Sequence, residues 1–243
     1  MAASKIRLSP KEPGAVDDDE VQTAFGGLLV QRRSWRLSWS GRLLVLALFI
    51  GGCAFATYNL DNFLSVNAPT HSDTLVIEGW IPPAPLYAAA NMIKNGHYRM
   101  VITSGCLASD EWGISTNDTY ADLAAMRLLK AGVDPKLILP IPSHVARKDR
   151  TYHSALAIKQ WFETNNVFPG SIDVITVGPH ARRSRLLYEK AFGDSVKIGI
   201  IPLDDALYSP TRWWTSSEGV REVTSEAFAY VYARFLFFTA DKS

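Results

Sequence analysis

A histidine and three arginines stand where a β-rich stretch passes into a helix, in the segment VGPHARRSRLLYEKAFG at residues 177–193. A helix N-terminus offers unpaired backbone N–H groups and a partial positive charge, which together bind anions. We therefore predict that His180 and Arg183 form a clamp for a phosphate or carboxylate, with the guanidinium as a fork of donors. Arg182 and Arg185 share one helix face and are expected to be solvated. The alternative is that the whole run is a basic surface.

A second polar cluster precedes another expected helix, which begins near residue 150. The loop before it is rich in charge: Arg147, Lys148, Asp149 and Arg150. Thr151 and Ser154 fall in the first helical turn, and Asp149 is positioned to cap it. Two such clusters favour an anionic ligand, and we expect Arg150, Thr151 and Ser154 to bind it. A charged loop before an ordinary capped helix is the alternative.

Glu78 is the carboxylate at the end of the first expected strand, DTLVIEG. It has the chemistry of a general base or of an acceptor for a sugar hydroxyl, and otherwise it is an ion partner for Arg150 or Arg183. His180 is the second candidate catalytic residue, because imidazole exchanges protons near neutral pH. We expect no metal site, since the five histidines lack metal-ligand spacing. No dinucleotide or Walker motif follows a strand, so the cofactor stays unknown.

Strand-like and helix-like segments alternate from residue 73 onward, which predicts a mainly parallel sheet with helices on both faces. Five strands are expected, at residues 73–80, 99–105, 136–142, 172–178 and 196–203. The predicted fold class is α/β, in a Rossmann-like three-layer arrangement. Ligands of such sheets bind beyond the carboxyl ends of the strands. This rule adds Gly79, Ser104 and Gly105 to the expected ligand-binding residues.

An apolar run without a charged residue begins at Leu43 and ends at Leu60. A spanning helix needs about 20 apolar residues, with a lower limit of about 17, so we predict a transmembrane helix at residues 41–61 that contacts the lipid bilayer. A buried core helix is the alternative, which the lack of a polar face disfavours. Four arginines lie within the twelve residues before the run: Arg32, Arg33, Arg36 and Arg42. The next lysine or arginine is Lys94, and this asymmetry predicts a cytoplasmic N-terminus and an extracytoplasmic remainder.

Four segments follow from these boundaries. Residues 1–40 are polar and aperiodic and are expected to form a disordered cytoplasmic tail, followed by the spanning helix, a linker at 62–72 and an α/β domain at 73–243. That domain is expected to close with one long helix at 218–238. The net charge of +1 gives no general attraction to nucleic acid, which we therefore exclude as a partner.

Four motifs occur in an order that resembles one bacterial family. They are DTLVIEG at 73–79, VITSG at 101–105, RTYHSA at 150–155 and VITVGPHARRS at 174–184. Together they are similar to the YdcF/SanA/ElyC-like proteins, and His180 and Arg183 fall in matching places. The resemblance implies a Rossmann-like fold and a link to bacterial envelope biogenesis, and many members of the family carry an N-terminal membrane helix. In a bacterium the predicted span lies in the inner membrane, and the extracytoplasmic side is the periplasm or the cell exterior. It does not supply an established reaction.

The chain departs from that family's pattern at three strand ends. Glu78 and Cys106 stand where glycines are usual, and Arg150 stands where asparagine is expected. These differences indicate a subgroup with its own site chemistry. We expect either an enzyme acting on a phosphorylated or glycan-linked envelope precursor, or a non-catalytic regulator or scaffold that binds such a ligand. The adjacent Trp213 and Trp214 are assigned to sugar stacking, to the membrane interface or to packing on the sheet edge.

Overall fold

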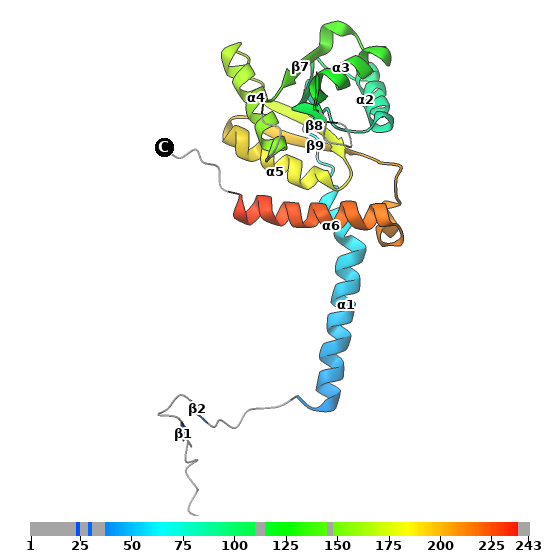
Figure 1. Ribbon diagram of the computed structural model, residues 1–243, viewed down its shortest axis with the longest axis vertical. Helices are drawn as coiled ribbons and strands as arrows, with labels where there is room; N and C mark the ends of the chain where they lie inside the picture. The colour runs from blue at the N-terminus through cyan, green and yellow to red at the C-terminus, as the bar shows by residue number, and fades with distance from the viewer. Residues whose placement is uncertain (1–22, 25–28, 31–36, 110–114, 145–147, 238–243) are drawn as a thin grey trace, which may run out of the picture. The chain divides into compact units, whose positions relative to one another are not determined.

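The protein is an α/β protein with one N-terminal apolar helix, as the computed structural model shows (Figure 1). The structure describes residues 23–24, 29–30, 37–109, 115–144 and 148–237. Most of the predicted tail, with Arg32, Arg33 and Arg36, lies outside the described residues, as does Arg147. Within that tail, β1 (Thr23–Ala24) and β2 (Leu29–Val30) pair antiparallel.

The apolar run forms one continuous helix, α1 (Trp39–Leu64). Its most apolar window has a mean hydropathy of 1.9, and it is long and apolar enough to cross a membrane. The chain divides into two compact units, Met1–Ile50 and Gly51–Ser243, and this helix passes through the division. The whole sheet lies in the second unit.

A parallel sheet of five strands forms the centre of the second unit, in the order β7-β4-β3-β8-β9. The strands are β3 (Thr74–Glu78), β4 (Met100–Gly105), β7 (Ile138–Pro142), β8 (Ser171–Val177) and β9 (Lys197–Leu203). All five expected strands are confirmed. They are runs rich in Val, Ile and Leu because both faces of a parallel sheet are buried.

Helices cover both faces of this sheet and make it a three-layer, Rossmann-like fold (Figure 1). The flanking helices are α2 (Pro83–Asn95), α3 (Tyr120–Lys130), α4 (Arg150–Thr164) and α5 (His180–Phe192). Side chains alternate across each strand, so Leu75 and Ile77 of β3 pack under α2 and α3, while Val76 packs under α4 and α5.

A short antiparallel hairpin of β5 (Leu107–Ser109) and β6 (Ser115–Thr119) follows β4. By residue type Asn117 and Asp118 predict a helix N-cap and a helix that starts there, but both residues belong to β6. Thr119 is the N-cap of α3, and its hydroxyl accepts a hydrogen bond of 3.1 Å from the backbone N–H of Asp122.

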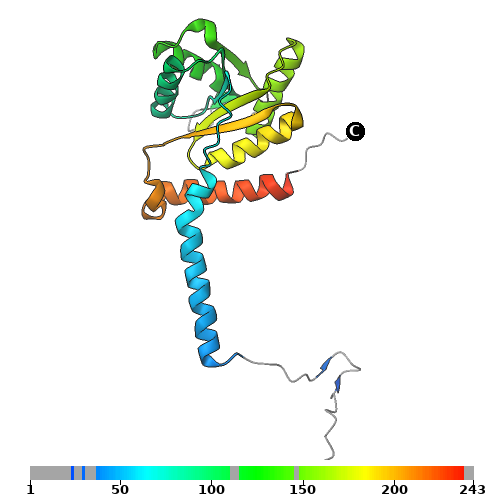
Figure 2. The ribbon, with the colours of Figure 1, turned by 180° about the vertical axis from the view of Figure 1, so that it is seen from behind.

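The chain ends in α6 (Ser217–Val231), which continues as a wider turn at Tyr232–Leu236. It packs on α5 and crosses the C-terminal end of α1, as Figures 1 and 2 both show. Trp213, just before α6, is buried and donates its indole N–H to the carbonyl of Thr57 in α1, at 3.0 Å. This tryptophan therefore packs on α1 and not on the sheet edge.

The segment between α1 and β3 is held to the sheet. Ala68 bridges to Ile200 of β9, and the buried Asp173 of β8 accepts hydrogen bonds from Thr70 and Ser72, at 2.7–3.0 Å. The predicted linker at 62–72 is thus a fixed connection whose first residues belong to α1.

Candidate functional site

A pocket of about 310 Å³ opens beyond the carboxyl ends of β3 and β4, beside the first turns of α4 and α5. Eight of the nine predicted site residues line it: Glu78, Ser104, Gly105, Arg150, Thr151, Ser154, His180 and Arg183. Gly79 does not. The volume is at the lower end of the range of about 300–1,000 Å³ that small-molecule pockets occupy.

The strand order explains why these residues meet. From β3 the chain runs outward through β4 and β7, and then crosses back so that β8 lies beside β3. Neighbouring connections leave in opposite directions at this point, which opens a crevice at the carboxyl ends of the two strands. Glu78 ends β3, and His180 begins the helix that follows β8.

Gly79 has a packing role beneath the pocket. Its N–H donates to the carbonyl of Ser104 at 2.7 Å, and an added Cβ would lie 2.3 Å from the carbonyl oxygen of Tyr120. A side chain at this position would push α3 away from the strand ends. The expectation that Gly79 contacts the ligand is therefore replaced by a role in close backbone packing.

Glu78 lies at the floor of the pocket, where it is 3% exposed. Thr176 donates to one carboxyl oxygen at 2.5 Å, and Ser184 donates to both, at 3.0 and 3.1 Å. Burial raises the pKa of Glu78 above its ordinary value, against the opposing effects of Thr176 and of the cations His180 and Arg183. A carboxyl in this setting has the chemistry of a general acid.

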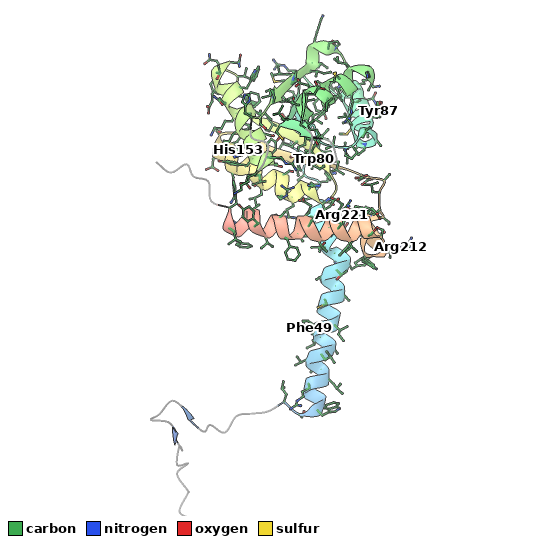
Figure 3. The ribbon with its side chains drawn as sticks, in the orientation of Figure 1. Phe49, Trp80, Tyr87, His153, Arg212 and Arg221 are labelled. Carbon is green, nitrogen blue, oxygen red and sulfur yellow. The ribbon has the colours of Figure 1, made fainter. Side chains whose placement is uncertain are left out.

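His180 and Arg183 are joined to two carboxylates of α6. Glu226 receives Arg183 through two donors, Nε at 2.7 Å and an Nη at 2.9 Å, and its Oε1 lies 3.0 Å from His180 Nδ1. Glu222 lies 3.6 Å from His180 Nε2. The ring of Trp80 lies against the imidazole at a centroid distance of 4.4 Å, and Trp80 is labelled in Figure 3.

These contacts set the charge of the cluster. Burial disfavours the imidazolium, but hydrogen bonds to Glu222 and Glu226 outweigh it and raise the pKa of His180 to about 9. Burial also disfavours ionised Glu226, but His180 and Arg183 outweigh it and lower the pKa of Glu226 to about 2. Two cations therefore face two carboxylates, and the predicted clamp of His180 and Arg183 is already neutralised within the protein.

The opposite wall of the pocket is formed by the first turn of α4. Arg150 is exposed, and among the described residues it makes no ion pair. Thr151 and Ser154 line the same wall, and Ser154 lies 3.3 Å from the hydroxyl of Ser143. Asp149 occupies the N-cap with a φ of 50°, but its side chain makes no capping hydrogen bond, so the expected capping role is wrong.

The other two arginines of the basic run point away from the pocket. Arg185 pairs with Glu189 one turn later at 2.8 Å, on the helix surface. Arg182 donates to the carbonyl of Phe63 and lies over its ring, 3.9 Å from the centroid. Arg182 is therefore partly solvated and also links α5 to the C-terminal end of α1.

Four residues that hold the site together were not predicted to do so from the sequence, although Thr176 and Ser184 lie within the motif at 174–184. Thr176 and Ser184 are the donors to Glu78, and Glu222 and Glu226 come from α6, which also supplies part of the pocket wall through Ala229, Tyr232 and Ala233. The one available signal was a carboxylate at 226 between the apolar positions Val223 and Ala227, where a helix face is expected to be buried.

Among the residues that the structure describes, no three His, Cys, Asp or Glu side chains are grouped to hold a metal ion.

Comparison of the chain with protein-family models, with curated proteins and with solved structures finds no match.

Proposed function

We propose that this chain is a membrane-anchored protein whose α/β domain binds an anionic ligand, phosphorylated or glycan-linked, in the pocket beside Arg150. In this proposal α1 spans the bacterial inner membrane, the N-terminus is cytoplasmic and the domain is periplasmic. The resemblance to the YdcF/SanA/ElyC-like proteins supports a role in envelope biogenesis.

The observation that carries the proposal is that Arg150 makes no ion pair with any residue that the structure describes. The cations of His180 and Arg183 are balanced by carboxylates, so Arg150 is the described pocket cation left for an external anion. It stands at the N-terminus of α4, whose first N–H groups and the hydroxyl of Thr151 add donors for a phosphate or carboxylate.

The polar floor of the pocket suits the uncharged part of such a ligand. Trp80 offers an aromatic face and Ser104 a hydroxyl, as a sugar ring requires. Glu78, whose raised pKa favours the protonated carboxyl, is the candidate proton donor in a reaction on that part. Ligand binding in this pocket is therefore compatible with group transfer or hydrolysis.

A non-catalytic regulator or scaffold is the second candidate function, and one observation favours it. Both oxygens of Glu78 accept hydrogen bonds from the protein, and His180 and Arg183 are committed to α6. Side chains with such internal hydrogen bonds and ion pairs stabilise the fold whether or not they transfer protons, and this is what a non-catalytic protein requires.

The test uses full-length protein in lipid nanodiscs. Native mass spectrometry identifies any co-purified ligand, and titration with inorganic phosphate, nucleotide sugars and lipid-linked sugar phosphates measures affinity. Arg150→Gln should weaken binding about ten- to a hundred-fold, which corresponds to about 1.5–3 kcal/mol for a charge-assisted hydrogen bond. Lys148→Gln is the matched control, because that exposed residue does not line the pocket. Equal affinities for both variants would contradict the proposal.

Glu78→Gln separates the two candidate functions. An enzyme that uses Glu78 as its proton donor should keep ligand binding and lose turnover. A regulator should keep both its binding and its ability to support growth under envelope stress.

A further inference from the structure

The C-terminal helical segment exposes an apolar stripe of five side chains, the α6 stripe: Phe228, Val231, Tyr232, Phe235 and Leu236. Their spacing of i, i+3, i+4, i+7 and i+8 places them on one helix face. Phe228 is 78% exposed and Phe235 is 66% exposed. A contiguous patch of this kind on a folded protein marks a surface that another apolar phase covers.

The opposite face of the same segment is already in use. Val223, Glu226 and Ala233 are buried, and Glu226 holds Arg183 of α5. The segment therefore has two different faces: one packs on the domain, and the other, the α6 stripe, is exposed. Rotation that hid the α6 stripe would break the ion pairs of the candidate site.

The C-terminal end of α1 packs on the buried face of α6 and on the turn before it, so the α6 stripe is left facing away from the domain. Phe63 of α1 packs edge-on against Tyr230 at a centroid distance of 5.7 Å, and Tyr58 lies 6.2 Å from Trp214. Figures 1 and 2 show α6 crossing α1 at this end. Since the buried face of α6 is turned toward the sheet, the α6 stripe faces the side on which α1 leaves the domain.

We propose that the α6 stripe lies in the interface of the same bilayer that α1 spans, with Phe228 and Phe235 among the acyl chains. An amphipathic helix of this kind rests about 5–10 Å deep, with aromatic residues at its border and basic residues reaching the head groups. Trp214 and Tyr232 supply the border aromatics, and the exposed Arg212 and Arg234 supply the charge. The inference rests on the proposed membrane anchoring by α1.

The side that the α6 stripe faces favours lipid over a second copy of the chain as the occupant. Phe55 of α1 is exposed, and the α6 stripe faces the side on which α1 leaves the domain, so an apolar phase around this part of α1 also meets α6. Arg221, labelled in Figure 3 on the polar first half of α6, is 71% exposed and suits a head-group layer.

The test places one environment-sensitive fluorophore at a time on full-length protein in phosphatidylcholine vesicles, with and without bromine on the acyl chains. Cys53 and Cys106 are first replaced by serine, and Phe228→Cys then carries the label. Phe55→Cys in α1 reports whether the anchor is inserted. Tyr87→Cys on α2 is the matched control, an exposed aromatic remote from α6 that Figure 3 labels.

We expect the labels at positions 55 and 228 to emit at shorter wavelength and to lose most of their emission to brominated lipid, and the label at position 87 to be unaffected. Quenching at 55 without quenching at 228 would overturn the inference and leave the proposed anchoring intact. Absence of quenching at both positions would overturn the anchoring itself. An unquenched 228 label together with a cross-link between two copies through Phe228→Cys would assign the α6 stripe to self-association instead. Near-ultraviolet circular dichroism of each labelled protein confirms that it is folded.

Discussion

Arg183 has more to do with holding α6 in place than with reaching a ligand. Its guanidinium makes two hydrogen bonds to a carboxylate that is 7% exposed, and its own side chain is 20% exposed. Removing one partner of such a pair leaves a buried charge without compensation, which is costlier than the pair itself is stabilising. Stability, rather than affinity alone, is therefore the property that substitutions here should change.

Arg183→Ala should lower the free energy of unfolding by about 3–5 kcal/mol, because Glu226 stays buried and ionised. Arg185→Ala should cost less than about 1 kcal/mol, since its pair with Glu189 is solvent-exposed. Urea unfolding followed by tryptophan fluorescence, in detergent micelles, gives both values. The double variant Arg183→Ala with Glu226→Ala should cost less than the sum of its single changes, and strict additivity would contradict a direct coupling.

His180 gives the fold a dependence on pH. Its pKa is raised from 6.5 to about 9 in the folded protein, so the stabilisation is complete below about pH 6.5 and is lost as the pH rises through about 9. Glu226 stays ionised over this range because its pKa is lowered to about 2. Unfolding free energies at pH 6.5 and 9.5 should therefore differ by an amount on the order of 1–3 kcal/mol. His180→Gln should abolish most of that difference, and an unchanged pH dependence would show that another group controls it.

The candidate site could be predicted from the sequence because ligands of parallel sheets bind at the carboxyl ends of the strands. Glu78, Ser104 and His180 each lie at or just after the carboxyl end of a strand, and such ends converge wherever the sheet is parallel. Glu222 and Glu226 were missed because no spacing rule links a helix to residues about 40 positions earlier. Their placement depends on how α6 packs, which is a tertiary property.

Close packing between elements leaves no room for a side chain at the junction of β3 and α3. Gly79→Ala should destabilise the protein by about 1–3 kcal/mol, because the new methyl group would meet backbone carbonyl oxygens of Tyr120 and Ser104 at 2.3 and 2.6 Å. Gly170→Ala is the matched control, since no atom lies within 4 Å of its added Cβ. That change should be neutral or stabilise by up to about 1 kcal/mol. Thermal unfolding by circular dichroism compares the two, and similar melting temperatures would contradict the packing role of Gly79.

The five strands of the sheet could be predicted because each is a run rich in β-branched and aliphatic residues; β3, β4 and β8 are almost wholly buried, and the edge strands β7 and β9 are partly buried. The hairpin of β5 and β6 could not be predicted, since Leu107–Ser109 is very short and Ser115–Thr119 is wholly polar. Antiparallel pairing of such segments is decided by their neighbours, which intrinsic propensity does not describe. Because the hairpin cannot be predicted, the cap-like residues Asn117 and Asp118 suggest a start of α3 that is too early, whereas the helix begins at Tyr120.

The proposed orientation of the chain across the membrane rests on the charges that flank its apolar run and is open to a direct test. A reporter that is active only outside the cytoplasm should be active when fused after Ser243, because basic residues gather before α1 and not after it. Changing Arg42 and the arginines upstream of it to glutamine should weaken that preference. Activity of a cytoplasm-only reporter at the same position would reverse the assignment and with it the periplasmic location of the domain.

The dependence of the pocket on α6 has a consequence for how the protein is made. Arg183 is synthesised 43 residues before Glu226, and Tyr232 and Ala233 of the pocket wall follow later still. At about 5–20 residues per second, the ribosome needs roughly 2–9 s to cover that interval. α5 and β9 are completed within this interval, so late in it the residues of the sheet and of the first five helices have been made while Glu226 and the last part of the pocket wall have not. A nascent chain therefore passes through a stage with a nearly complete fold and no finished site, and it gains the site only when its last helix has docked.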